Sequence, residues 1–312
     1  PRIGGTIHYR PSKGEPMALG VVQELVSNEG SGWEHALHEV GQYLESVKNL
    51  APTSQGGASP EAEADGPSGE VRELVGSYLN AAAILGQRTA EMHLALATTT
   101  DDEAFNPEPL SKRDLTAVVR GMTQQARVAT KELKRNLKEL PESLHEPAHA
   151  LLADPELLSS RLTTLADLPF KASKIRCHGD YHLGQVLRRE SDFVILDFEG
   201  EPAHSIADRR RKGCPLKDVA GMMRSFSYAA YTGLFAITQD RTEDYPLLEP
   251  WAAAWSRWMS AEFLRSYLQT SGEAVFLPQE RTSLGQWLDG FVLEKACYEL
   301  VYELNNRPTW VR

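Results

Sequence analysis

A short polar stretch between Cys177 and Pro202 contains the residues best suited to chemistry. It begins with His178-Gly179-Asp180, places Gln185 five residues after the aspartate, and continues through an apolar segment to Asp197. Phosphoryl transfer requires an aligned nucleophile and metal ions that neutralise the phosphate oxygens. Mg²⁺ accepts a carboxylate and an amide oxygen beside the phosphates, while another carboxylate can take the proton of the attacking hydroxyl. The stretch therefore predicts a magnesium-dependent phosphotransferase site.

The order of these residues resembles the catalytic and metal-binding loops of protein kinases, in which H-R-D is followed by Asn and then by D-F-G. Here Gln185 replaces the asparagine, and Glu199 replaces the glycine. The resemblance implies that Asp180 is the general base, that Gln185 and Asp197 hold Mg²⁺, and that ATP is the donor. An apolar strand at 193–196 would hold Asp197 on a rigid element.

The two histidines of the stretch allow a different interpretation, a zinc pair formed by His178 and His182. This spacing brings two ligands together on a helix, whereas Gly179 and the flanking sequence predict a loop. We therefore interpret His178 as structural support for the loop. His182 is either a substrate contact or a packing residue.

Composition limits the functions that are open to the chain. Its 312 residues carry a formal net charge of −10 with a pI near 5.5, which argues against a nucleic-acid partner. Three cysteines without metal-ligand spacing favour a reducing, cytoplasmic location over a disulfide framework. The sequence contains neither a signal peptide nor an apolar run long enough to span a membrane, so no membrane partner is predicted.

The first 27 residues contain two strand-like pieces, 6–10 and 17–26, separated by a turn signal. The second piece resembles the last N-lobe strand and hinge of a kinase, which implies ATP contacts at Gln23, Glu24 and Val26. No glycine-rich loop and no strand lysine precede it, although kinases use both to hold the phosphates. We therefore expect residues 1–27 to be the end of a truncated N-lobe, and 28–312 to be a helical C-lobe.

Apolar residues at helical spacing predict helices at 33–47, 71–97, 112–140 and 141–165, and another that begins at Pro215. Residues 51–70 are rich in Gly, Pro, Ser and acidic residues and predict a flexible insertion. The basic stripe on 112–140 is interpreted as a solvated helix face. Asp218 either complements the dipole of its helix or, as the kinase resemblance implies, braces the catalytic loop.

The last helix, predicted at 283–305, has an apolar face and a second face that carries carboxylates and tyrosines. A solvated stripe with packed tyrosines would produce this pattern, but a sugar site also needs carboxylates beside aromatic rings. We expect the second face to line a sugar pocket with residues of the catalytic stretch. The predicted substrate contacts are His182, Glu199, Lys295, Tyr298, Glu299, Tyr302, Glu303 and Arg307.

Five segments together resemble the maltokinases, a group of aminoglycoside phosphotransferase-like kinases. They are VVQELVSNEGSGWEHAL (21–37), HGDYHLGQVL (178–187), ILDFEGEP (195–202), PLKDVAGMMRSFSYAA (215–230) and EKACYELVYELNNRPTW (294–310). The resemblance implies an α+β, bilobal protein-kinase-like fold with a mostly helical C-lobe. It also implies ATP-dependent phosphorylation of maltose to maltose 1-phosphate, with fusion to or association with trehalose synthase.

Two other functions stay open. Glucosamine kinases share the HGD and DFEGEP elements, so an amino sugar could be the substrate instead of maltose. A non-catalytic pseudokinase is the third interpretation. The missing N-lobe lysine favours it, whereas the intact residues Asp180, Gln185 and Asp197 oppose it.

Overall fold

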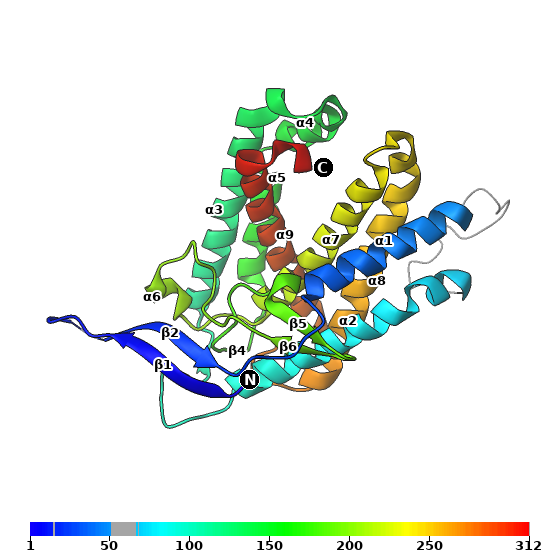
Figure 1. Cartoon of the computed structure of the whole chain (residues 1–312). Coiled ribbons are helices and arrows are strands. Elements are labelled where there is room, and N and C mark those ends of the chain that lie inside the picture. The colour runs from blue at the N-terminus through cyan, green and yellow to red at the C-terminus, as the bar shows by residue number, and fades with distance from the viewer. Residues whose placement is uncertain (15, 51–66, 68, 312) are drawn as a thin grey trace.

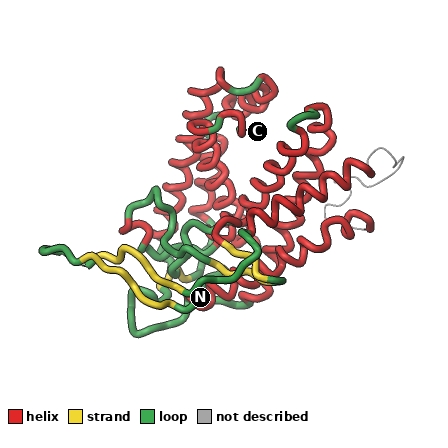
Figure 2. Tube along the Cα trace, viewed as in Figure 1, coloured by secondary structure: helices red, strands yellow, loops and turns green. Residues whose placement is uncertain are grey.

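The computed structural model describes residues 1–14, 16–50, 67 and 69–311. Helices make up most of the molecule, and the described strands pair into small two-stranded antiparallel sheets (Figures 1 and 2). Most of the predicted insertion 51–70 lies outside the described residues. Within the described ranges, no helix is long and apolar enough to cross a lipid bilayer.

The N-terminal residues form a two-stranded hairpin in the region where two strand-like pieces are predicted. Strand β1 (Ile3–Tyr9) pairs antiparallel with β2 (Met17–Gln23), with Ile3 opposite Gln23. The hairpin extends away from the helices (Figure 1). Val21 and Val22, which point to opposite faces, are 56% and 54% exposed, so neither face of the hairpin is covered.

One group of helices consists of α1 (Gly32–Leu50), α2 (Gly69–Leu96), α7 (Leu216–Thr238) and α8 (Tyr245–Ser271), which pack against one another (Figure 1). The predicted helices at 33–47 and 71–97, and the one beginning at Pro215, correspond to α1, α2 and α7. Helix α8 is not among the predicted helices. Pro246 and Pro250 lie near its start, and proline usually ends a helix rather than continuing it.

The second group consists of α3 (Lys112–Asn136), α4 (His145–Ala153), α5 (Leu157–Thr163) and α9 (Arg281–Asn306). The prediction of a single helix at 141–165 was wrong, because α4 and α5 are separated at Asp154-Pro155. A residue before proline is driven out of the helical conformation, and Asp154 has φ −127° and ψ 86°. The groups meet where α7 contacts α9.

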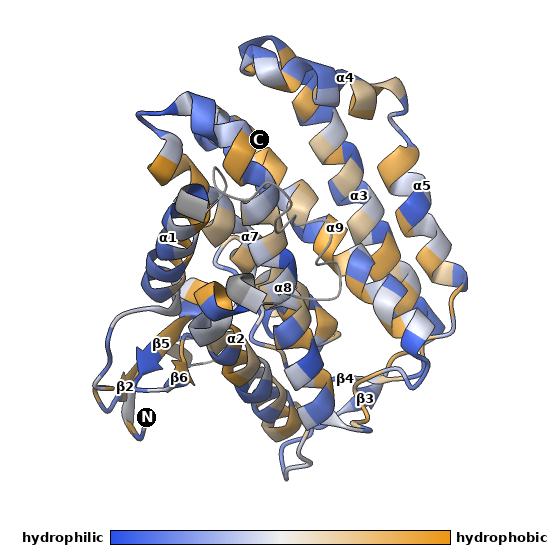
Figure 3. Cartoon of the chain, turned by 90° about the vertical axis from the view of Figure 1, so that its right-hand side faces the viewer, coloured by the Kyte–Doolittle hydropathy of each residue, from blue (hydrophilic) through white to orange (hydrophobic). Residues whose placement is uncertain are grey.

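Helix α3 is amphipathic, as its sequence predicts. It begins with a capping box in which the Ser111 hydroxyl accepts the N–H of Asp114 and the Asp114 carboxylate accepts the N–H of Ser111. Its basic side chains, including Arg120 and Lys131, are exposed, and its hydrophilic stripe is visible in Figure 3. The interpretation of this stripe as a solvated face is confirmed.

Short elements between the helix groups carry the catalytic stretch. Strand β5 (Val186–Arg189) pairs with β6 (Asp192–Ile195), which corresponds to the apolar strand expected before Asp197. A second pair joins β3 (Glu108–Pro109) to β4 (Ser173–Lys174), and α6 (Ile206–Arg209) follows the stretch.

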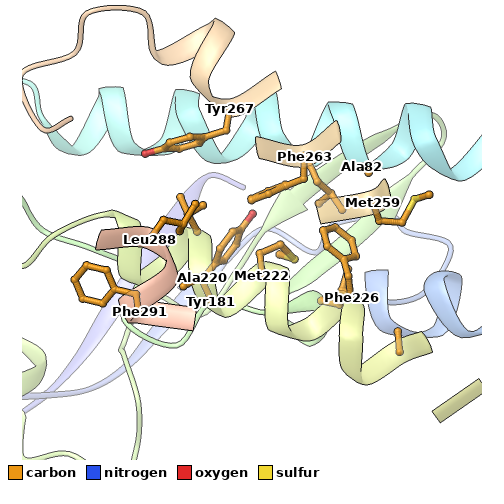
Figure 4. Close-up of a cluster of buried hydrophobic side chains, with 14 of the residues drawn as sticks. Ala82, Tyr181, Ala220, Met222, Phe226, Met259, Phe263, Tyr267, Leu288 and Phe291 are labelled. Carbon is orange, nitrogen blue, oxygen red and sulfur yellow. The ribbon is translucent and has the colours of Figure 1, made fainter. Parts of the chain in front are cut away.

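The main core lies where α2, α7 and α8 converge on the catalytic stretch (Figure 4). Phe226, Phe263 and Tyr267 are fully buried there, and Tyr181 extends from the stretch into the same cluster. The close approach of α2 to α8 requires Gly86, because a Cβ at that position would lie 2.2 Å from the carbonyl oxygen of Phe263. The catalytic stretch is therefore anchored to the main hydrophobic core through Tyr181.

Candidate active site

Helix α7 holds the catalytic stretch through its backbone. The Asp218 carboxylate accepts the N–H groups of His178 at 2.7 Å and Gly179 at 2.9 Å. One turn later, a Cβ on Gly221 would lie 2.6 Å from the carbonyl oxygen of Tyr181, so glycine is needed for this approach. These contacts fix the backbone on both sides of Asp180.

Asp218 also connects the loop to buried side chains of α2 and α8. His93 Nε2 lies 3.2 Å from its carboxylate, and His93 Nδ1 lies 2.9 Å from the Tyr267 hydroxyl. Burial acts to raise the pKa of Asp218, but the hydrogen bonds from His93 and the loop backbone outweigh it and hold the pKa below its usual value. The carboxylate is thus kept ionised inside the core.

His178 joins the two halves of the stretch. Its Nε2 lies 2.7 Å from the carbonyl oxygen of Leu196, so this nitrogen donates a hydrogen bond. The ring packs between Tyr181 and Phe198, with centroid distances of 5.2 Å and 5.0 Å. Across the described residues, no cluster of three or more His, Cys, Asp or Glu side chains could hold a metal ion. The geometry of His178 therefore supports the structural interpretation rather than the zinc pair.

Gln185 and Asp197 lie side by side at the end of the stretch. The Gln185 side-chain nitrogen Nε2 donates to the Asp197 carboxylate at 3.2 Å, and the Leu196 N–H donates to the backbone carbonyl oxygen of Gln185 at 2.9 Å. Asp197 has φ +61°, a conformation that non-glycine residues adopt rarely and often at functional sites. A carboxylate and a side-chain amide oxygen are a donor set that suits Mg²⁺, because both are hard oxygen ligands, and Gln185 would present its Oε1 to the ion in place of the hydrogen bond to Asp197. The pair therefore fits a magnesium ion.

Asp180 faces the ring of His182 across 3.9 Å. His182 Nδ1 accepts the N–H of Gly184 at 3.0 Å, so the neutral ring carries its proton on Nε2, the nitrogen that is directed toward Asp180. Burial lowers the pKa of His182, while the Asp180 carboxylate acts in the opposite direction. We therefore expect a neutral imidazole beside the carboxylate at pH 7.

Two cavities meet at Asp180. The larger, of about 580 Å³, is called the acceptor pocket here. The smaller, of about 120 Å³, shares Asp180, Glu201, Lys295 and Tyr298 with it. The predicted substrate contacts that line the acceptor pocket are His182, Lys295, Tyr298, Glu299, Tyr302 and Arg307. The catalytic stretch and α9 therefore form opposite walls of one cavity.

Two ion pairs hold the part of α9 that faces α7. The Glu299 carboxylate accepts from Arg224 Nε at 2.9 Å and Nη2 at 2.8 Å. Burial raises the pKa of Glu299, although the Arg224 charge acts to lower it. Glu303 accepts from the Tyr228 hydroxyl and from Arg307 Nη2, the latter at 2.7 Å. Of the predicted substrate contacts, Glu303 thus lies beyond the acceptor pocket, in the interface between α7 and α9.

Comparison with known proteins identifies curated relatives that include two glucosamine kinases. No family model matches the chain. A glucosamine kinase from Mycolicibacterium smegmatis is 28% identical over 246 residues, which cover 77% of this chain and 53% of the relative. A glucosamine kinase from Streptacidiphilus jiangxiensis is 27% identical over 235 residues, covering 74% and 46% respectively. The chain thus spans about half the length of these curated relatives.

Solved structures give the same result for the fold. A glucosamine kinase in complex with glucosamine, ADP and inorganic phosphate superposes with a TM-score of 0.66 at 23% identity, covering 95% of this chain and 62% of that chain. A second crystal form of glucosamine kinase gives a TM-score of 0.67 at 22% identity, covering 100% and 63%. The chain shares its fold with glucosamine kinases.

The comparisons change one expectation of the sequence analysis. The relatives named above are glucosamine kinases, and they lend no support to maltose as the substrate or to fusion with trehalose synthase. They favour the alternative, an amino-sugar kinase. The expectation of a kinase-like fold is supported, whereas the division into lobes at residue 27 stays a prediction.

Some predicted site residues lie away from both cavities. Glu199 is exposed, and its carboxylate lies 3.5 Å from Arg209 Nη1. At the predicted hinge, Gln23 pairs with Ile3, and the N–H of Glu24 donates to the Arg2 carbonyl at 2.9 Å. The Val26 carbonyl accepts from the Asn28 side chain at 2.9 Å. The role of these four residues in substrate or ATP binding stays a prediction.

The structure adds residues that sequence reasoning did not assign. Glu201 and Tyr228 line the acceptor pocket, and His93 and Tyr267 support Asp218 from the core. Glu201 was recognisable, because it belongs to the DFEGEP motif. His93 and Tyr267 carried no signal, since a histidine and a tyrosine within apolar helices look like ordinary core residues.

Proposed function

We propose that this chain carries the catalytic and acceptor-binding part of a kinase that transfers the γ-phosphoryl group of ATP to an amino sugar, with glucosamine as the first candidate. The observation that carries the proposal is the position of Asp180, at the junction of two cavities and beside the wall formed by α9. The named relatives add weight, because each is a glucosamine kinase.

In the proposed reaction, Asp180 accepts the proton of the sugar hydroxyl as the hydroxyl oxygen attacks the γ-phosphorus. The new oxygen–phosphorus bond forms as the bond to the β,γ-bridging oxygen breaks, and ADP leaves with that electron pair. The contacts from Asp218 and Gly221 to the loop keep the Asp180 backbone in place during this step. The neutral His182 ring can donate a hydrogen bond to the substrate or to Asp180.

Asp197 and Gln185 are the residues that would hold Mg²⁺ through their side-chain oxygens. Mg²⁺, when bound, neutralises charge that develops on the phosphate oxygens. The backbone hydrogen bond between Leu196 and Gln185 keeps both ligands at the same end of the β5–β6 hairpin. Gln185 and Asp197 belong to the same stretch as Asp180, so the same segment would position the metal ion and the base.

The charges of the smaller cavity favour an amino sugar over a neutral one. Its walls include the carboxylates of Asp180, Glu201 and Glu294, beside the ammonium groups of Lys217 and Lys295. Lys295 Nζ lies 4.9 Å from the ring centroid of Tyr298, so part of its charge is directed at an aromatic face. The ammonium of a hexosamine can form charge-assisted hydrogen bonds with the carboxylates.

An ADP-release assay of the full-length protein tests this proposal. We expect ATP- and Mg²⁺-dependent turnover with glucosamine that exceeds turnover with glucose, maltose and maltotriose. The variant Asp180→Asn should lose most of the turnover, by more than about 100-fold, while ADP binding is retained. Asp240→Asn, an exposed aspartate outside the site, is the matched control and should behave as wild type.

Three results would contradict the proposal. Preference for maltose would return the assignment to the maltokinase alternative. Near-normal turnover of Asp180→Asn would remove this residue as the base. Nucleotide binding without turnover of any of these sugars would favour the non-catalytic interpretation.

A further inference from the structure

The start of α1 forms a third wall of the acceptor pocket. Trp33, in the first turn of this helix, lines the pocket together with Asp180 and with Tyr298 and Tyr302 of α9. The Trp33 side chain is half-buried, since it packs in part against the main core. The steps proposed for the reaction do not involve it. A large aromatic side chain in the wall of a substrate pocket is therefore without an assigned role.

The two residues before α1 hold the start of the helix against β5 (Figure 1). Ser31 forms an antiparallel bridge with Leu187, and the Arg188 N–H donates to the Gly30 carbonyl oxygen at 2.9 Å. Strand β5 begins directly after the proposed metal ligand Gln185. The indole is thus tied to the same hairpin as the metal ligands.

The first turn of α1 is fixed by two further features. In a capping box, the Ser31 N–H donates to the Glu34 carboxylate at 2.8 Å, and the Glu34 N–H donates to the Ser31 hydroxyl at 3.2 Å. A Cβ at Gly32 would lie 2.5 Å from Val186 Cγ2 and 3.0 Å from the Leu183 carbonyl oxygen, so the helix touches the catalytic stretch at this point. The pocket therefore receives the indole from a rigid element, as a binding site requires.

The aromatic rings of the pocket differ in what packs against them. Lys295 Nζ lies 4.9 Å from the Tyr298 ring centroid, and the Arg307 guanidinium lies 5.6 Å from the Tyr302 ring centroid. Within the described ranges, neither a cation nor a second aromatic ring packs on the indole of Trp33 in this way. The indole is therefore the aromatic surface of the pocket that has no cation next to it.

We infer that Trp33 is an acceptor-binding residue, whose indole packs against the C–H face of the amino-sugar ring. This inference rests on the proposed function. A pyranose ring carries its hydroxyls and its ammonium at the edge and presents apolar C–H groups on its faces, which suit an aromatic surface. With one face against Trp33, the ring directs its edge toward Asp180 and the other carboxylates. Trp33 thus orients the reacting hydroxyl, whereas the carboxylates recognise the amine.

Calorimetric titration of the full-length protein with glucosamine, and separately with ADP, tests the inference without requiring turnover. Trp33→Leu keeps an apolar side chain on the helix but removes the flat ring, and Trp33→Phe keeps a ring. We expect the Kd for glucosamine to rise at least about tenfold in Trp33→Leu and less than about threefold in Trp33→Phe. The Kd for ADP should stay within about twofold of wild type in both variants.

Trp251→Leu is the matched control for the loss of an indole. Trp251 lies on α8 and is also half-buried against the main core, but it lines neither the acceptor pocket nor the smaller cavity. This variant should bind glucosamine as wild type does. Thermal unfolding of each variant shows that the protein titrated is folded.

The outcomes separate this inference from the proposed function. If wild type and Trp33→Leu bind glucosamine equally well, the role of Trp33 is overturned and the amino-sugar kinase stays intact. Weaker binding of ADP, with unchanged binding of glucosamine, would place Trp33 in the nucleotide site and overturn the inference. An equal loss in Trp33→Phe or in Trp251→Leu would also overturn it. If wild type binds no glucosamine, the proposed function fails, and this inference fails with it.

Discussion

The conformation of Asp197 places its carboxylate beside Gln185 at the end of β6. Its φ of +61° is unfavourable for a residue with a Cβ and is maintained by the surrounding hairpin and by the contact of His178 with Leu196. Strained backbone conformations of this kind cluster at functional sites. They cost free energy, and they persist only where the surrounding structure enforces them. Metal binding is a function that would account for it.

We expect Asp197→Ala to abolish the Mg²⁺-dependent part of ATP binding and to lower kcat/KM by more than about 100-fold, because the main charged ligand is lost. Titration of ATP with and without Mg²⁺ measures this effect. Asp240→Asn serves again as the control. An unchanged dependence on Mg²⁺ would show that the metal is held elsewhere.

Asp218 combines a structural role with a titratable charge. Its folded-state pKa lies below the usual value near 4, so its stabilisation is present above about pH 4 and is lost as pH falls through the folded-state pKa. Asp218→Asn should therefore lower the free energy of unfolding by about 3 kcal/mol at neutral pH, and by less at acidic pH.

Denaturant unfolding of wild type and Asp218→Asn at several values between pH 3 and pH 7 measures the difference. A difference in the free energy of unfolding that becomes smaller toward pH 3 agrees with an ionised carboxylate in the folded protein. A difference in the free energy of unfolding that does not change with pH would show that packing or hydrogen bonding, rather than charge, accounts for the lower stability of the variant.

At the scale of elements, the site depends on how closely α7 approaches the catalytic stretch. Gly221 permits this approach, and no side chain could replace its hydrogen without displacing the Tyr181 carbonyl. Because Tyr181 directly follows Asp180, a shift of this carbonyl moves the proposed base. The helix therefore controls activity through its backbone as well as through Asp218.

Gly221→Ala should lower kcat by about tenfold to 100-fold, because displacing a reacting group by up to about 1 Å has effects of this order. Gly121→Ala on α3 is the matched control. A Cβ at Gly121 meets no atom within 4 Å, so the change should preserve kcat and slightly raise stability. Equal kcat values for both variants would contradict the importance of this approach.

At the scale of the whole molecule, two helix groups meet at the substrate cavities. The acceptor pocket is lined by Tyr228 of α7 in the first group and by Glu299 of α9 in the second. A ligand in the acceptor pocket therefore contacts both groups. Binding should therefore stabilise the molecule as a whole rather than a single segment.

We expect glucosamine at about 100 times its Kd to raise the free energy of unfolding by about 2.7 kcal/mol, and Tm by about 5 °C or more. Thermal unfolding monitored by circular dichroism measures this shift. N-acetylglucosamine, in which the ammonium is replaced by a neutral amide, is the matched control and should give a smaller shift. Equal shifts would contradict recognition of the ammonium by the carboxylates of the site.

The sequence by itself determined the order and spacing of Asp180, Gln185 and Asp197, the two strand-like pieces at the N-terminus, and the helices with one apolar face. These features are local. Residue type, periodicity and the apolar strand before Asp197 are sufficient to predict them. The sequence also placed Tyr298 and Glu299 on the polar side of α9, where the structure finds the acceptor pocket.

Only the tertiary structure decided which polar residues meet. Glu199 and Glu303 look equivalent in sequence, yet one is exposed beside Arg209 and the other is buried between Tyr228 and Arg307. The support of Asp218 by His93 and Tyr267 joins residues from three helices far apart in the chain. Contacts between distant segments depend on how helices cross, and sequence periodicity specifies the face of a helix but not its partner.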